Sequence, residues 1–186
     1  MNQLSRSIVL IGVMGAGKSS VGRCLHRRTG LALHDTDEIV TSKFGMSIPE
    51  IFAEYGEKQF REAETEALRH VRTEEQTIII TGGGIVLRKE NVEILKRLGV
   101  IVWLDGDEET HFARTSRKQN RPLLQTKNPR KTFSQILGAR RPLYANIADI
   151  RVDTSVLTDE EVAVAILAKL RRMNTKTESL IPAKAS

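Results

Sequence analysis

Residues 12–19 carry the clearest chemical signal in the sequence. They fit the pattern G-x-x-x-x-G-K-[ST] at every position, with an apolar run before them and a helix-compatible segment after them. Glycines let backbone N–H groups curl around a phosphate, and the helix that begins near Gly17 adds the positive end of its dipole. Lys18 supplies a cation for the β- and γ-phosphates of a nucleotide, and the Ser19 hydroxyl can ligate Mg²⁺. The residues predicted to contact the nucleotide here are Gly12, Gly15, Ala16, Gly17, Lys18, Ser19 and Ser20.

Two carboxylates, Asp35 and Asp37, follow the next short apolar run. At the carboxyl end of a strand they would face the γ-phosphate, where a carboxylate holds Mg²⁺ or orients a hydroxyl for attack. We expect Asp35 to lie nearer the metal and Asp37 nearer the acceptor. The alternative is that Asp37, or Thr36 between the two, merely caps the following helix.

Three consecutive glycines, Gly82, Gly83 and Gly84, end another β-branched run. Three glycines in a row cost backbone entropy, so they need a ligand that touches the main chain or a sharp turn of the chain. At the carboxyl end of a strand in an α/β fold, contact with a ligand is favoured over a turn alone.

Arg61 stands among glutamates in a helical segment. Spacing alone favours an exposed ion pair that contributes little to stability, although Glu64, one turn on, could hold the guanidinium in a fixed orientation. Arg140 belongs to a second cationic pair, which could equally complement a helix dipole.

A basic loop at 117–130 contains Arg117 and Arg121. A mobile loop with arginines could close over a phosphate site, exclude water and stabilise the transferring charge. The alternative is a solvated basic loop, which composition does not exclude.

The elements that must position these side chains alternate along the chain. Apolar runs predict strands at 7–11, 31–34, 77–81, 100–104 and 150–152, with helices between them. The alternation implies an α/β, three-layer P-loop NTPase fold with a parallel five-stranded sheet flanked by helices. The carboxyl ends of its strands would line one crevice, which gathers the residues above.

The same patterns predict the boundaries of the later elements. Helices are expected at 133–143 and 158–172, the second opened by a capping box from Thr158 to Glu161. We expect one domain over residues 1–173, with a disordered tail over 174–186.

Composition narrows the class of protein further. The chain has 186 residues, which suits one domain, and a net charge of +6 whose lysines and arginines are dispersed. Aromatic residues make up only 4%, so base stacking on nucleic acid is not expected. The one cysteine excludes an intrachain disulfide and fits a reducing compartment, and no apolar run reaches membrane-spanning length. A cytoplasmic protein with no nucleic-acid or membrane partner, and a monomer, is the expectation.

The ordered set of motifs resembles the shikimate kinase family over nearly the whole chain, from about residue 7 to 172. The phosphate loop at residues 12–19 is by itself common to many NTPases. The specific part is the order of five further motifs: Asp35-Thr36-Asp37, Phe60-Arg61-x-x-Glu64, Gly82-Gly83-Gly84, Arg121-Pro122-Leu123-Leu124 and Arg140-x-Pro142-Leu143-Tyr144.

The resemblance implies a nucleoside-monophosphate-kinase-like fold and ATP-dependent phosphorylation of the 3-hydroxyl of shikimate, on the route to chorismate and the aromatic amino acids. It implies that Asp37 binds the ring hydroxyls and acts as the base, and that Arg61 and Arg140 hold the carboxylate. The glycine triplet would contact the substrate through its backbone, and Arg121 would reach the phosphates beside Lys18. The segment 153–156 lacks the basic residue that some members place near the adenine, so Arg117 is the candidate to cover one face of that ring.

Three other functions remain open from the sequence. A kinase for another hydroxy acid, such as gluconate, would share the phosphate loop but should lack the glycine triplet and the paired arginines in this order. A nucleotide-dependent switch is disfavoured because the chain has no Asn-Lys-x-Asp motif. A non-catalytic ATP-binding relative is disfavoured by the presence of Lys18, Ser19, Asp37 and Arg121.

Overall fold

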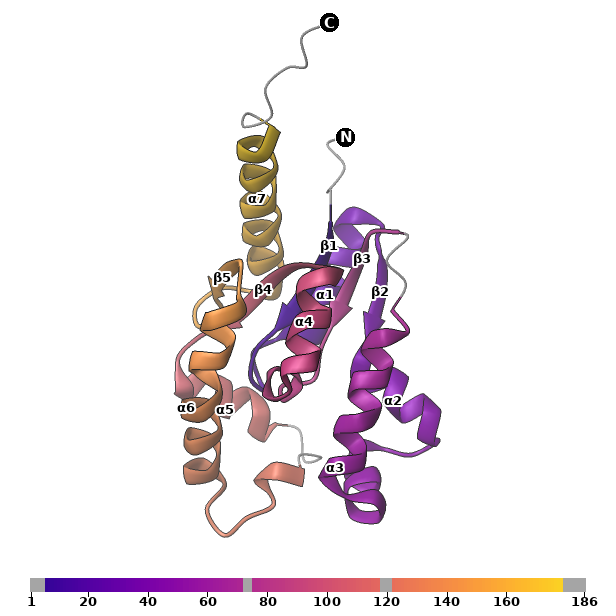
Figure 1. Cartoon of the computed structure of the whole chain (residues 1–186). Coiled ribbons are helices and arrows are strands. Elements are labelled where there is room, and N and C mark those ends of the chain that lie inside the picture. Colours follow the sequence, from indigo (N-terminus) through magenta and orange to yellow (C-terminus); the bar gives the residue numbers. More distant parts are fainter. Residues whose placement is uncertain (1–5, 72–74, 118–121, 179–186) are drawn as a thin grey trace, which may run out of the picture.

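A parallel sheet of five strands, in the order β2-β3-β1-β4-β5, forms the centre of the molecule (Figure 1). The computed structural model describes residues 6–71, 75–117 and 122–178. β1 pairs with β3 on one side and with β4 on the other, in registers that set Leu10 opposite Ile80 and Val102. The strands are β1 (Ser7–Ile11), β2 (Ala32–Asp35), β3 (Thr77–Ile80), β4 (Gly99–Asp105) and β5 (Ile150–Asp153).

Helices flank the sheet, which gives the predicted three-layer α/β architecture (Figure 1). α1 packs beside α7 and against β3, whereas α4 contacts β1 and β4, and α6 contacts β4. The helices are α1 (Lys18–Thr29), α2 (Thr36–Phe44), α3 (Ile48–Arg69), α4 (Lys89–Leu98), α5 (Glu108–Ser116), α6 (Pro129–Ile147) and α7 (Asp159–Glu178), with short 3₁₀ turns η1 (Ile85–Leu87) and η2 (Pro122–Leu124).

The main hydrophobic core lies along the three central strands. Every residue of β1, β3 and β4 is buried, as expected for parallel strands covered on both faces. A second, smaller core lies between α2 and α3, around Val40, Ile51 and Phe60. The α2–α3 pair therefore has apolar packing of its own, beside the main core.

Two helix boundaries differ from the sequence prediction. α6 begins at Pro129 rather than 133, because the Asn128 side chain accepts a hydrogen bond from the Lys131 N–H at 3.0 Å and a first-turn proline needs no donor. It continues past Pro142 to Ile147, since the buried Tyr144 and Ile147 pack against the main core. The predicted loop at 117–130 is thus shorter, and it also contains η2.

α7 is also longer than predicted. The capping box is present: the Glu161 carboxylate accepts from the Thr158 N–H at 2.8 Å, and the Thr158 hydroxyl oxygen accepts from the Glu161 N–H at 3.3 Å. The helix then runs to Glu178 rather than ending near 172, so residues 174–178 are helical and not part of a disordered tail. The rest of the expected tail, 179–186, lies outside the described residues. Within the described ranges, no helix is both long enough and apolar enough to cross a membrane.

We expect α7 to unfold cooperatively with the sheet, because one of its faces is part of the main core. Ile166 is fully buried, so Ile166→Ala should lower the free energy of unfolding by about 2–5 kcal/mol. Val164, in the same helix, is 47% exposed, and Val164→Ala should change it by about 0.5 kcal/mol or less. Urea unfolding followed by circular dichroism measures both. Equal, small effects of the two variants would show that α7 folds apart from the sheet.

Candidate active site

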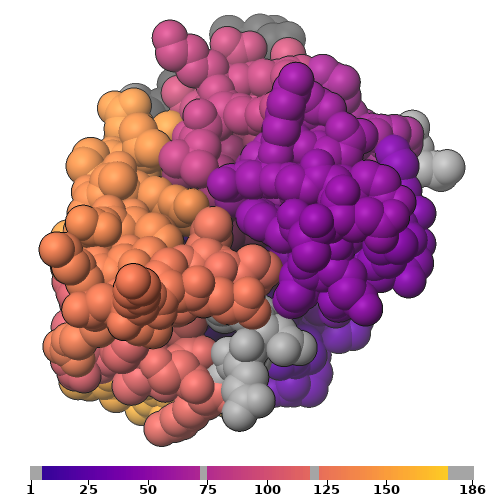
Figure 2. Space-filling model, turned by 90° about the horizontal axis from the view of Figure 1, so that it is seen from below, coloured from indigo at the N-terminus to yellow at the C-terminus, as the bar shows by residue number. Residues whose placement is uncertain are grey.

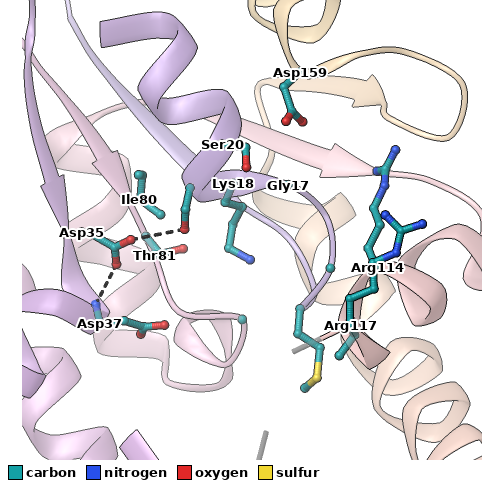
Figure 3. A pocket seen from close by; sticks show the side chains of 15 residues that line it. Gly17, Lys18, Ser20, Asp35, Asp37, Ile80, Thr81, Arg114, Arg117 and Asp159 are labelled. Atoms are coloured by element: carbon teal, nitrogen blue, oxygen red, sulfur yellow. Dashed lines mark hydrogen bonds between the residues drawn. The ribbon is translucent and has the colours of Figure 1, made fainter. Parts of the chain in front are cut away.

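A cavity of ≈ 360 Å³, here called the donor cavity, opens at the carboxyl ends of the central strands (Figure 3). The glycine-rich loop forms its floor, and Figure 3 shows Lys18 pointing into it between Asp35 and Asp37 on one side and Arg114 and Arg117 on the other. Its lining residues are Met14, Gly15, Gly17, Lys18, Ser19, Ser20, Asp35, Asp37, Ile80, Thr81, Gly83, Arg114, Thr115, Arg117 and Asp159.

The glycine-rich loop, residues 12–17, packs so closely against its neighbours that a side chain would not fit at Gly15. Gly15 has φ of +82°, and a Cβ there would lie 2.2 Å from the carbonyl oxygen of His111 in α5. The loop also accepts hydrogen bonds from its own lysine, since Lys18 Nζ donates to the carbonyls of Gly12 at 2.8 Å and Val13 at 3.0 Å. The ammonium is thereby held over the concave side of the loop, where phosphates bind in loops of this type.

Asp35 connects the loop to the start of α2. Its Oδ1 accepts from the Asp37 N–H at 3.0 Å, so Asp35 is the cap of α2, and the alternative assignment of the cap to Asp37 or Thr36 is wrong. Its Oδ2 lies 3.4 Å from the Ser19 hydroxyl that donates to it. The cap therefore holds the second carboxylate oxygen against the glycine-rich loop, and it leaves the Asp37 side chain directed to the cavity.

A second, smaller cavity of ≈ 60 Å³, here called the acceptor cavity, lies between α3 and α6. Figure 2 looks toward this end of the molecule and shows the surface hollowed between the α2–α3 side and the α6 side. Its lining residues are Met14, Asp37, Ile48, Phe52, Phe60, Arg61, Glu64, Gly82, Gly83, Gly84, Pro122, Leu123 and Arg140. It combines one apolar wall with two guanidinium groups and two carboxyl groups.

Arg61 is 8% exposed and lies in a buried ion pair, not in the exposed pair that its spacing favours. Its Nη1 donates to Glu64 Oε2 at 2.5 Å, and its Nη2 donates to Glu57 Oε1 at 2.9 Å. The guanidinium also lies over the Phe60 ring, 5.2 Å from the centroid. Two carboxylates and one ring therefore fix its orientation toward the cavity.

Glu64 is fully buried, and burial raises the pKa of its carboxyl group to about 7. Arg61 and Arg140 act in the opposite direction, while the neighbouring Asp37 charge raises the pKa further. The cost of taking the carboxylate out of water outweighs the attraction of the guanidinium. The burial of Glu64 therefore gives the acceptor cavity a carboxyl group that changes charge near neutral pH.

The glycine triplet approaches these side chains closely. A Cβ on Gly82 would lie 2.2 Å from Glu64 Oε1 and 2.7 Å from Asp37 Oδ1, and a Cβ on Gly84 would lie 2.3 Å from Arg61 Nη1. None of the three glycines has a positive φ. Close side-chain contacts therefore leave no room for a Cβ at Gly82 and Gly84, whereas a Cβ on Gly83 would face the backbone of the glycine-rich loop, 3.3 Å from the Met14 nitrogen.

α6 brings the second guanidinium to the same cavity. Arg140 is buried and lines it, one helical turn before the fully buried Tyr144. The Tyr144 hydroxyl donates to the Gly83 carbonyl, and burial raises the pKa of Tyr144 to about 12. The phenol thus stays a neutral donor that ties α6 to the glycine triplet.

The two cavities meet. Three residues, Met14, Asp37 and Gly83, line both of them. A group held in the donor cavity and a group held in the acceptor cavity would therefore face each other beside Asp37.

The predicted site residues divide into three groups. Most line one of the two cavities, but Gly12 and Ala16 are buried within the loop. Arg121 lies outside the described residues. Three further residues that line the donor cavity, Arg114, Asp159 and Met14, were not predicted from the sequence. Arg114, for example, donates to the carbonyl of Thr154 at 2.9 Å, and no local motif marks that contact.

Comparison with known proteins identifies the family. The shikimate kinase family model matches residues 14–171, which is most of the chain. The chain belongs to the shikimate kinase family. A shikimate kinase of Thermodesulfovibrio yellowstonii is 43% identical over 173 residues, which cover 92% of this chain and 99% of that protein. A shikimate kinase of Thioalkalivibrio sulfidiphilus is 41% identical over 95% of this chain and 92% of its own length.

Solved structures agree with this assignment. Shikimate kinase from Acinetobacter baumannii in complex with shikimate has a TM-score of 0.86 with this chain at 36% identity, covering 90% of this chain and 93% of the other. A gluconokinase from Sinorhizobium meliloti has a TM-score of 0.61 at only 19% identity over 96% of this chain and 99% of its own. That second likeness shows the shared P-loop kinase fold alone.

The raised pKa of Glu64 predicts a specific pH dependence of stability. Between about pH 4.5 and 7 the folded chain binds a proton at Glu64 that the unfolded chain has lost, so the free energy of unfolding should fall as pH rises through this window. The free energy of unfolding should fall by about 3–4 kcal/mol across this window, since each unit of pKa shift corresponds to about 1.4 kcal/mol. Urea unfolding at several pH values, compared with Glu64→Gln, isolates it.

Glu62→Gln is the matched control, because Glu62 is exposed in the same helix. It removes a solvated carboxylate and so separates loss of charge from loss of a buried group. If wild type and Glu64→Gln differed by the same amount at every pH, the pKa of Glu64 would not be raised by folding.

Proposed function

We propose that this protein transfers the γ-phosphoryl group of ATP to the 3-hydroxyl of shikimate, giving shikimate 3-phosphate and ADP. The observation that carries the proposal is the junction of the two cavities at Asp37, with two buried arginines in the smaller one. Shikimate has a carboxylate and ring hydroxyls, so it needs cations, a carboxylate and an apolar wall together. The family assignment and the shikimate complex of the Acinetobacter baumannii relative support the same substrate.

ATP would occupy the donor cavity with its phosphates on the glycine-rich loop. Lys18 would neutralise the β- and γ-phosphates, and the helix that begins at Lys18 would present its N–H groups to them. Arg117 and Arg121 are proposed to reach the nucleotide from the loop that follows α5. Arg114 is a further candidate to contact the adenine ring, since its guanidinium is held at the Thr154 end of the donor cavity.

Mg²⁺ fits the oxygen donors on the metal side of this cavity. The Ser19 hydroxyl and the Asp35 carboxylate lie 3.4 Å apart and both line it. No cluster of three or more His, Cys, Asp or Glu suited to a metal occurs in the described part of the chain, but Mg²⁺ keeps several waters and phosphate oxygens and needs only one or two protein ligands. When bound, it would neutralise charge on the β- and γ-phosphates.

Shikimate would occupy the acceptor cavity. Arg61 and Arg140 would hold its carboxylate, because two guanidinium groups fix both charge and orientation. Phe52 and Phe60 would cover the ring, and Gly82, Gly83 and Gly84 would contact it through their backbone groups. The lining of this cavity supports the placement, since two arginines and several apolar side chains share a narrow space.

The reaction itself then requires mainly position and charge. Asp37 orients the 3-hydroxyl and accepts its proton as the oxygen forms a bond to the γ-phosphorus. The bond from that phosphorus to the β–γ bridging oxygen breaks, and ADP leaves with the electron pair. Lys18 and Arg121 stabilise the charge on the transferring group.

Gluconate kinase activity is the second candidate for the acceptor. The gluconokinase likeness reaches only the fold, and the buried arginine pair beside the glycine triplet favours shikimate. We also propose that the protein is a monomer and that it works in a reducing compartment such as the cytoplasm. The single cysteine supports the reducing compartment.

ADP release measured with a panel of hydroxy acids tests the acceptor. We expect saturable turnover with shikimate and little with gluconate. Asp37→Asn should lower kcat by about 10²–10⁴-fold, because the amide cannot take the proton. Circular dichroism is the check that this variant folds. A shikimate-saturable Asp37→Asn enzyme with unchanged kcat would remove Asp37 from the role of base, and turnover with gluconate alone would overturn the proposed acceptor.

Gly84→Ala tests the carboxylate clamp without altering a charged group. Its Cβ would lie 2.3 Å from Arg61 Nη1, so the guanidinium must move, and KM for shikimate should rise by about 10–100-fold. Gly138→Ala in α6 is the matched control, because a Cβ there meets nothing within 4 Å. Steady-state kinetics at saturating ATP measure both variants. An unchanged KM in Gly84→Ala would mean that Arg61 does not hold the acceptor.

A further inference from the structure

Met14 occupies an unusual place between the two cavities. Of the three residues that line both, Asp37 offers a carboxylate and Gly83 offers backbone, so Met14 is the one with an apolar side chain. Met14 is only 8% exposed. Met14 therefore lies beside the point at which a phosphoryl group would cross from donor to acceptor.

The backbone of Met14 is fixed, so its position at the junction is determined by the fold. Its N–H nitrogen lies 3.3 Å from the place that a Cβ on Gly83 would occupy, which is close packing of the glycine-rich loop on the glycine triplet. The Ala16 N–H donates to the Val13 carbonyl at 3.2 Å and closes the turn around Met14. Tyr144 holds the other side through the Gly83 carbonyl.

The reaction needs a means to prefer a hydroxyl over water. Asp37 would accept a proton equally from the substrate hydroxyl or from a water molecule, so the carboxylate does not discriminate between them. In hydrolysis, water oxygen would form the bond to the γ-phosphorus, the bond to the β–γ bridging oxygen would break, and phosphate and ADP would leave. An ordered water needs two to four polar partners, and a thioether is at most a weak acceptor.

We propose that Met14 is a specificity-determining residue that directs phosphoryl transfer to the substrate hydroxyl by keeping water out of the junction beside Asp37. This inference rests on the proposed phosphoryl transfer to shikimate. The acceptor cavity is small, ≈ 60 Å³, and Met14 shares its lining with the apolar residues Ile48, Phe52, Phe60, Pro122 and Leu123. The flexible methionine side chain can fill the space around different positions of the phosphoryl group.

Three variants separate water exclusion from simple packing. Met14→Ala opens room for about one or two waters, each of which takes about 30 Å³. Met14→Gln keeps the length and flexibility of the side chain but adds polar atoms that can hold a water. Met14→Leu keeps an apolar side chain of similar size and is the conservative control.

The decisive measurement is the ratio of ADP formed to shikimate 3-phosphate formed in the same reaction, together with ADP release in the absence of shikimate. Wild type and Met14→Leu should give a ratio near one. Met14→Ala and Met14→Gln should give excess ADP, and their shikimate-independent ATP hydrolysis should rise by about tenfold, which corresponds to about 1.4 kcal/mol in barrier.

The outcomes distinguish this inference from the proposed function. If Met14→Ala and Met14→Gln lose kcat but keep the wild-type ratio and the wild-type background hydrolysis, Met14 has only a packing role and the inference is overturned. If wild type forms no shikimate 3-phosphate, the proposed function fails, and the ATP hydrolysis of the variants without shikimate still tests whether Met14 excludes water. Thermal unfolding of Met14→Gln checks that a full-size side chain preserves the fold.

Discussion

The pairing of β1 with both β3 and β4 is the constraint on which the rest of the site depends. Parallel pairing in register makes the chain leave β1 and β3 at the same edge of the sheet. The glycine-rich loop and the glycine triplet therefore meet, with Met14 against Gly83. A Cβ at Gly15 would enter the His111 carbonyl of α5, and a Cβ at Gly82 or Gly84 would enter the side chain of Glu64 or Arg61. Glycines at these positions therefore let each loop pack closely against its neighbouring helix.

Most of the charged side chains of the acceptor cavity are buried, so each of these needs a partner of opposite charge. Arg61 and Glu64 are both buried, and each would be costly without a partner. Their contact fixes the guanidinium, while burial keeps the pKa of Glu64 near 7. Such a pair adds little to stability by itself, and its structural effect is to fix the orientation of the Arg61 guanidinium in the cavity.

The two cavities are built by different parts of the fold. The donor cavity lies on the main core, whereas one wall of the acceptor cavity belongs to α3, which packs with α2 around its own small core. Asp37, at the start of α2, stands where these two parts join. Under the proposed function, this arrangement would separate recognition of the nucleotide from recognition of the acceptor, with a narrow junction between the two cavities.

The sequence by itself determined the parallel five-stranded α/β fold and the phosphate loop, because strand runs, helix periodicity and the G-x-x-x-x-G-K-[ST] spacing are local signals. The resemblance of its ordered motifs pointed to the shikimate kinase family, which the family model supports. Helix ends were less well predicted: α6 starts at the Asn128 cap and α7 runs to Glu178, as capping and packing decide. Only the tertiary structure made Arg61 a buried residue, assigned the α2 cap to Asp35, and brought Met14 and Arg114 to the cavities. Those features depend on contacts between residues far apart in the chain, and burial, not spacing, decides whether an arginine among glutamates is a solvated ion pair or part of a binding cavity.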